Sequence, residues 1–134
     1  MEMPVTFAKG VVEEIVDRAD AFANEVCGLL LGEGRQVTVV LHCSNVSAAP
    51  ATSFEIDPRQ LIAALKVERA GGPHVLGCYH SHPASGAPTP SPRDARDAAP
   101  NGWLWFIAAG RGVGLYRAVE QGAIHGRFDA VPRS

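Results

Sequence analysis

At 134 residues the chain is long enough to bury the core of one domain and too short for two, so we expect a single domain over residues 1–134. Its apolar share of 46% and charged share of 19% are typical of a soluble globular protein. The net charge of −2 provides no basic surface, which disfavours a nucleic-acid partner, and no run approaches the roughly 18 apolar residues of a membrane span.

The first part of the chain predicts a helix followed by a hairpin. Apolar residues recur at helical spacing over residues 11–23, with charged residues on the other face, which indicates an amphipathic helix. The run EVCGLLLG at 25–32 indicates a buried strand, and Gly34 marks a turn into a second strand at 37–41.

A polar loop and a second helix are expected next. Residues 43–53 are mostly small and polar, so they predict a surface loop. Asp57 and Pro58 are typical of the N-cap and the first position of a helix, and Gly71 and Gly72 are typical of its end.

The remaining chain predicts a strand, a short helix and three further strands. These are a strand at 74–79 that leads directly into His80, a short helix near 92–98, and strands near 103–109, 113–119 and 123–128. The order of the elements predicts an α/β protein with a mixed sheet that is covered by helices.

Two histidines follow the strand at 74–79. Side chains two apart on an extended segment point to the same side, so His80 and His82 can present both imidazoles to one ion. Pro83 has no backbone N–H to donate to a neighbouring strand, so it ends the strand just after the second histidine.

A short helix brings a carboxylate to the same region. Ser91 is a typical N-cap, Pro92 fits the first helical turn, and Asp94 occupies the capping-box position. Two imidazoles and one carboxylate leave the fourth position of a zinc ion free for water, which marks a catalytic site. We therefore expect one zinc ion per chain, bound by His80, His82 and Asp94.

Two further residues can complete a hydrolytic site. Zinc lowers the pKa of bound water toward about 7, and Glu25 is the candidate general base that accepts the proton and passes it to a leaving amine. The hydroxyl of Ser91 can donate to the oxyanion of a tetrahedral intermediate.

These residues resemble the signature of the JAMM (MPN+) metallopeptidases. That signature is H-S-H-P, seven residues, S, two residues and D, which here spans His80 to Asp94. The upstream segment E-x-C-G-x-L-x-G, from Glu25 to Gly32, is also typical of the family, as are I-D-P at 56–58 and G-C-Y-H at 77–80.

The resemblance implies a fold, a set of roles and a class of substrate. The fold is a three-layer α/β/α arrangement with a mixed, curved sheet, similar to cytidine deaminases. His80, His82 and Asp94 bind zinc, Glu25 activates the water, and Ser91 stabilises the intermediate. The compact chain is more similar to bacterial members that trim or release ubiquitin-like sulfur-carrier proteins than to the eukaryotic deubiquitinating members. The C-terminal tail of such a sulfur-carrier protein would pass between two loops, at 43–53 and 84–90, which we assign as the walls of the substrate site.

Each of these residues also has a purely structural interpretation. His80 and His82 can be polar residues at a strand end. Ser91 and Asp94 can simply cap a helix, and Glu25 can be a surface residue in the last turn of the first helix. At the level of function, the alternative is a non-catalytic MPN scaffold or a RadC-like interaction module. The oligomeric state stays open.

The other chemically notable residues receive structural assignments. Cys27, Cys43 and Cys78 form no C-x-x-C pair, which indicates reduced thiols in the cytoplasm. The N-terminal segment has neither the basic nor the apolar region of a secretory signal. Three histidines have no partner at a ligand spacing, and we interpret them as structural or surface residues: His42, His74 and His125. Trp103 and Trp105 alternate along a predicted strand, and we expect one of the two to lie in the core.

Overall fold

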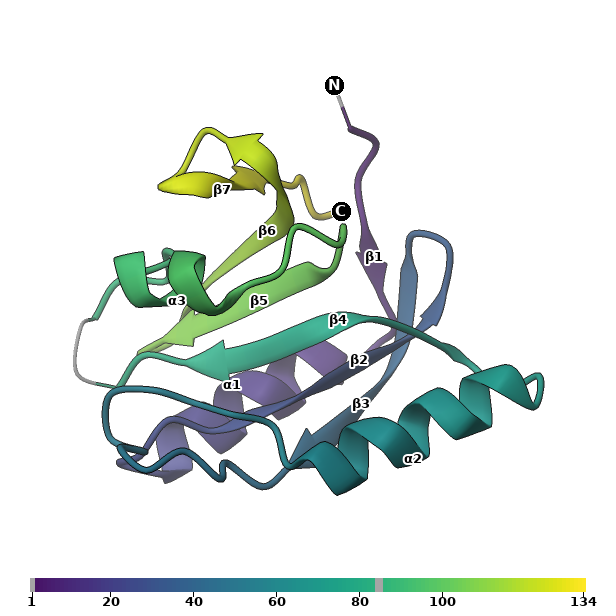
Figure 1. The fold of residues 1–134 in the computed structure, drawn as a ribbon, viewed down its shortest axis with the longest axis horizontal. Helices are drawn as coiled ribbons and strands as arrows, with labels where there is room; N and C mark the ends of the chain where they lie inside the picture. Colours follow the sequence, from purple (N-terminus) through teal and green to yellow (C-terminus); the bar gives the residue numbers. More distant parts are fainter. Residues whose placement is uncertain (1, 84–85) are drawn as a thin grey trace.

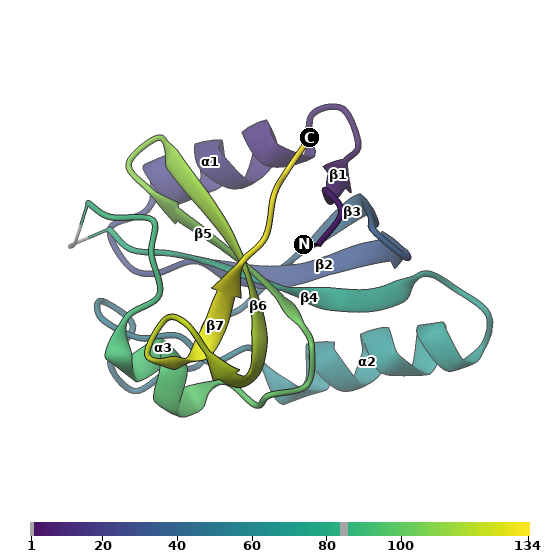
Figure 2. The same ribbon diagram turned by 90° about the horizontal axis from the view of Figure 1, so that it is seen from above.

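A seven-stranded mixed sheet forms the centre of the computed structural model, which describes residues 2–83 and 86–134. The strand order is β1-β3-β2-β4-β5-β6-β7. Helix α1 covers one face of the sheet, and α2 and α3 lie against the other (Figures 1 and 2). The predicted three-layer α/β/α arrangement is therefore confirmed.

The elements have the following bounds. They are β1 (Thr6–Phe7), α1 (Val11–Ala21), β2 (Cys27–Glu33), β3 (Gln36–Cys43), α2 (Pro58–Arg69), β4 (His74–Ser81), α3 (Pro92–Asp97), β5 (Leu104–Ala109), β6 (Gly112–Gly122) and β7 (Gly126–Ala130). Strand β4 pairs antiparallel with β2 and parallel with β5, so it lies in the middle of the sheet. None of the helices in the described ranges is long and apolar enough to cross a membrane.

The helices begin where the sequence predicts and end slightly earlier. The Asp57 side chain accepts a hydrogen bond from the backbone N–H of Arg59 at 2.9 Å, which confirms the predicted N-cap of α2. Helix α1 ends at Ala21, because Phe22 adopts an extended backbone conformation. The chain therefore leaves the helix before Glu25, and the predicted end at residue 23 is two residues too late.

The strands differ more from prediction. Strand β4 continues two residues beyond the predicted end, because His80 and Ser81 pair with Ile107 and Ala108 of β5. The two-residue β1 was not predicted, since so short a segment has no periodicity. Strand β6 is longer than its predicted range of 113–119, and β7 begins later than predicted because the chain turns through positive φ at Gln121 and His125.

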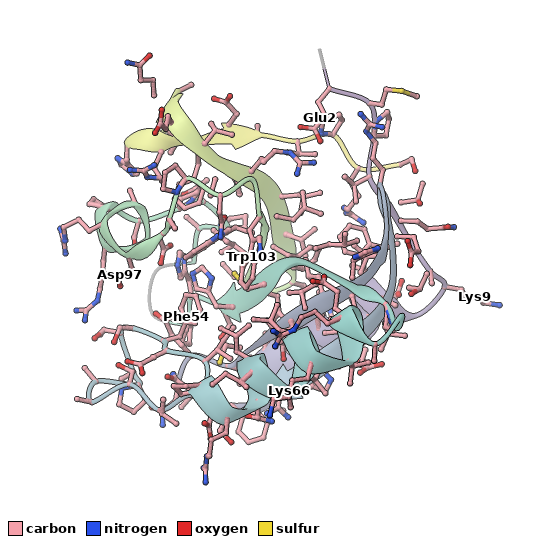
Figure 3. The ribbon with its side chains drawn as sticks, turned by 45° about the vertical axis from the view of Figure 1, so that its right-hand side comes forward. Glu2, Lys9, Phe54, Lys66, Asp97 and Trp103 are labelled. Carbon is pink, nitrogen blue, oxygen red and sulfur yellow. The ribbon has the colours of Figure 1, made fainter. Side chains whose placement is uncertain are left out.

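The core has two parts, one on each side of the sheet. The side beneath α1 holds Ile15, Leu30, Tyr79, Phe106 and Leu115, among others. The side of α2 and α3 holds a second set that includes Leu29, Cys78, Trp105, Ile107 and Phe128. Trp105 is buried, as predicted for one of the two tryptophans, and all three cysteines are buried free thiols. Phe54 and Trp103, labelled in Figure 3, lie on this second side, between α2 and α3.

Candidate metal centre

The candidate ligands come from the end of β4 and the start of α3. His80 is the second-last residue of β4 and is fully buried, and His82 lies just beyond the strand end. Asp94 is in the first turn of α3 and is also buried. The parallel pairing of β4 with β5 fixes the strand end, and the N-cap of α3 fixes the carboxylate against it.

Three side-chain atoms meet at the corners of a small triangle. The Nε2 atoms of His80 and His82 are 2.9 Å apart, and each lies 3.2 Å from Oδ2 of Asp94. Zinc bonds to nitrogen and oxygen are about 2.0–2.1 Å, so neighbouring ligands of a tetrahedral zinc ion lie about 3.3 Å apart. The triangle therefore has nearly the dimensions of three zinc ligands, and the group can hold a metal ion.

The protonation states of the group suit a cation. Nδ1 of His82 lies 3.2 Å from the carbonyl oxygen of Ala87, which can only accept, so Nδ1 donates and Nε2 is free to bind a metal. Burial lowers the pKa of His80, which keeps its imidazole neutral. Burial alone would raise the pKa of Asp94, but the neighbouring rings of His80 and His82 and the backbone N–H of Ser91 place it well below its usual range.

Ser91 caps α3 and holds Asp94 in place. Its Oγ accepts from the backbone N–H of Asp94 at 3.0 Å, and its own backbone N–H donates to Oδ2 of Asp94 at 3.0 Å. This is the capping box that the sequence predicts, and capping by both residues is compatible with a further role for each. Capping uses a lone pair of the hydroxyl and leaves its proton available to another acceptor.

Glu25 lies in the segment between α1 and β2 and is only 7% exposed. Its backbone N–H donates to the carbonyl of Pro50 at 2.8 Å, and its carbonyl accepts from Nδ2 of Asn45 at 3.0 Å. Burial raises the pKa of its carboxyl to about 7, while His82 opposes the rise. The alternative of a surface residue in the last turn of α1 is therefore wrong.

A hollow of about 420 Å³ joins these groups. Glu25, His82 and Ser91 line it together. Its other lining residues come from both predicted walls and the start of α3: Ala51, Thr52, Ala87, Thr89, Pro90 and Pro92. Within the predicted wall at 84–90, residues 84 and 85 lie outside the described residues. The hollow thus places a carboxyl group and a hydroxyl on the side of the histidine–aspartate triangle where His82 lies.

The family model of the prokaryotic homologs of the JAB domain matches residues 8–121. The chain belongs to this family. The match includes Glu25, both histidines, Ser91 and Asp94, which agrees with the resemblance seen in the sequence.

Two curated relatives carry descriptive names. The Desampylase of Haloferax volcanii is 38% identical over 87 residues, which are 63% of this chain and 62% of the relative. The "Probable TtuB-protein conjugate cleaving protease" of Thermus thermophilus is 42% identical over 75 residues, or 56% of this chain and 49% of the relative. The matched part of this JAB-family chain thus spans between about half and three fifths of these relatives.

Solved structures share the fold. A protein from Desulfitobacterium hafniense superposes with a TM-score of 0.78 at 29% identity, covering 97% of this chain and 91% of that one. A JAB1/MPN domain protein from Archaeoglobus fulgidus superposes with a TM-score of 0.60 at 17% identity, covering 99% of this chain and all of that one. The second likeness supports the predicted JAB1/MPN fold.

Two residues near the triangle were missed by sequence reasoning. The ring of Phe54 stacks on that of His80, and the side chain of Asn45 links the loop before α2 to Glu25. Phe54 is the one aromatic residue in the small, polar stretch around it, and this contrast was the available signal. The assignment of His42 as structural is confirmed, because its ring joins Tyr79 and Glu14 through contacts of 2.6 and 2.7 Å.

Proposed function

We propose that this protein is a zinc metallopeptidase that hydrolyses a peptide or isopeptide bond at the C-terminal tail of a ubiquitin-like protein of the sulfur-carrier type. The observation that carries the proposal is the meeting of three ligand atoms, together with a hollow that one of the ligands, His82, lines with Glu25 and Ser91. His80, His82 and Asp94 would hold the ion. Zinc bound there would supply Lewis acidity and lower the pKa of bound water toward about 7.

Glu25 is proposed as the proton carrier of the reaction. A general base is most effective when its pKa is close to the working pH, and in the metal-free protein burial raises the pKa of Glu25 to about 7. Its carboxylate can take a proton from the attacking water and then deliver it to the nitrogen of the departing amine. The hydrogen bonds of the Glu25 backbone to the carbonyl of Pro50 and to the side-chain amide of Asn45 hold the residue in the hollow during both transfers.

Ser91 is proposed to donate its hydroxyl hydrogen to the oxyanion that forms at the scissile carbonyl. Its oxygen is already held by the N–H of Asp94, so the hydroxyl is oriented before substrate binds. Pre-oriented donors of this kind lower the barrier because they need no reorganisation when charge develops.

Replacing Ser91 by alanine tests this role. We expect a loss of about 10²–10³ in kcat with metal content unchanged. Loss of the N-cap also lowers the free energy of unfolding by about 0.5–2 kcal/mol, so thermal unfolding is measured alongside turnover. Ser91→Thr keeps both the cap and the hydroxyl and is expected to retain most activity. A lower Tm with unchanged kcat in Ser91→Ala would show that Ser91 only caps the helix.

The substrate class rests on the two named relatives and on the shape of the site. One relative is called a Desampylase and the other a protease that cleaves TtuB–protein conjugates. An extended tail can pair its backbone with exposed strand or loop segments, while pockets select side chains. The tail must pass His80 and His82 in an extended form, so we expect small residues, such as Gly-Gly, next to the scissile bond. Three free cysteines fit the reducing cytoplasm, where we propose the protein acts.

A substrate panel tests this specificity. We expect zinc-loaded enzyme to cut bacterial ubiquitin-like proteins that carry a C-terminal extension directly after Gly-Gly, and to leave casein intact. The matched control is the same fusion with Gly-Gly replaced by Leu-Leu, which should be cut far more slowly. Mass spectrometry of the products locates the cleaved bond. Efficient casein digestion without cleavage after Gly-Gly would contradict the specificity while leaving the zinc chemistry standing.

A further inference from the structure

The two histidines of the triangle are oriented by different contacts. Nδ1 of His82 donates to the carbonyl of Ala87 at 3.2 Å, which is the usual support of a metal-binding histidine. His80 is fully buried, yet its Nδ1 has no hydrogen-bond partner within residues 2–83 and 86–134. No hydrogen bond from the described residues therefore sets the rotation of the His80 ring from its far side.

Aromatic rings hold His80 instead. The ring of Phe54 stacks on the imidazole with centroids 4.3 Å apart and an interplanar angle of 18°. The ring of Trp105 lies edge-on to the imidazole, with centroids 5.6 Å apart and an interplanar angle of 85°. The Trp105 ring also lies edge-on to the ring of Phe54, with centroids 5.6 Å apart and an interplanar angle of 68°. The imidazole is thus held against one ring face to face and against another nearly at right angles.

The position of Phe54 is itself fixed by Asn45. The Asn45 side chain donates from Nδ2 to the carbonyl of Ser53 and accepts at Oδ1 from the N–H of Glu55, both at 3.0 Å. These are the residues immediately before and after Phe54. The same Nδ2 also donates to the carbonyl of Glu25. One amide therefore ties the backbone on both sides of Phe54 to the segment that carries the candidate base.

We propose that Phe54 is a positioning residue that holds the His80 imidazole in its metal-binding orientation, a role that no hydrogen bond from the described residues to Nδ1 fills. The inference rests on the proposed ligation of a metal by His80. A flat ring stacked on the imidazole restricts its rotation about the Cβ–Cγ bond more than a flexible aliphatic side chain in the same place would. Phe54 touches neither the metal nor the reacting atoms in this role.

Cobalt(II) is the probe, because its visible absorption reports both binding and ligand geometry. Supporting residues around metal ligands contribute about 10–100-fold to affinity, so we expect Phe54→Leu to weaken cobalt binding by that factor and to change the absorption bands. Phe54→Tyr keeps the stacked ring and should restore nearly wild-type affinity. Phe7→Leu is the matched control, since Phe7 packs edge-on against Phe106 beneath α1, on the other face of the sheet. It should lower stability without changing cobalt affinity.

A second readout uses the metal-free protein. The NMR signals of the His80 ring should move and broaden in Phe54→Leu, while those of His82, held by Ala87, should change much less. Equal cobalt affinity, equal spectra and unchanged His80 signals in wild type and Phe54→Leu would overturn the inference alone. A wild-type protein that binds no cobalt would overturn the proposed metal centre and this inference together.

Discussion

Protein carrying His82→Ala is expected to hold far less than one zinc ion per chain and to have only background hydrolytic activity. The substitution removes one of three ligand atoms that lie about 3 Å from one another. His80 and Asp94 alone provide two ligands, fewer than the three protein ligands of catalytic zinc sites. Metal analysis of purified protein, before and after zinc loading, measures the loss.

The histidine at the other end of the same strand provides the control. His74 is the first residue of β4 and is largely exposed, with its ring near Glu33 and Glu68. His74→Ala should keep one zinc ion per chain and near wild-type turnover. Stoichiometric zinc in His82→Ala would show that the ligand assignment is wrong, and zinc loss in His74→Ala would show that the effect is not specific to the triangle.

The ligand set could be proposed from the sequence because its constraints are local. The alternation of side chains along a strand puts His80 and His82 on one side, and Pro83 follows just after the strand end. The capping box of Ser91 and Asp94 depends on only four consecutive residues. Each of these two arrangements involves residues that are close together in the sequence, so their spacing alone was sufficient to predict it.

What the sequence did not reveal depends on contacts between distant segments. The burial of Glu25 goes with hydrogen bonds to Asn45 and Pro50, which lie 20 and 25 residues further along the chain. The stacking of Phe54 on His80 joins a loop to a strand end, and no periodic pattern encodes such a contact. The end of β4 was placed too early for the same reason, because pairing with β5 extends it.

The same arrangement places opposing demands on Glu25. A base that carries protons at neutral pH needs a pKa near 7, and burial provides it. Burial of a carboxylate also destabilises the folded chain whenever the carboxylate is charged and no cation is near. The residue therefore links catalytic activity to the stability of the metal-free protein, and a single substitution can separate the two.

Glu25→Gln is expected to keep the zinc and the fold and to lose about 10²–10⁴ in kcat, since an amide cannot accept the proton of the attacking water. The control is Glu13→Gln, an exposed position of α1. Turnover of a ubiquitin-like fusion and metal content are measured for both variants. Undiminished turnover in Glu25→Gln would rule out Glu25 as the base.

The same variant is expected to be more stable than wild type above neutral pH once the metal is removed by a chelator. The pKa of Glu25 rises from 4.5 in the unfolded chain to about 7 in the folded one. Between these values the folded state binds more protons, so wild-type stability falls as pH increases through this window. Each pKa unit corresponds to about 1.4 kcal/mol, which places the loss at up to about 3 kcal/mol by pH 8.

Glutamine carries no charge at any pH, so the variant lacks this loss. Urea unfolding of chelator-treated protein gives the free energy of unfolding of both proteins at pH 5 and pH 8. The quantity compared is the difference between variant and wild type at each pH. The stability of Glu25→Gln relative to wild type should increase from pH 5 to pH 8, whatever constant offset the amide introduces. Glu13→Gln should show no such increase. If the free energy of unfolding changes with pH in the same way for wild type and Glu25→Gln, the carboxyl of Glu25 titrates in the folded protein as it does in the unfolded chain. The proposed matching of its pKa to neutral pH would then be wrong.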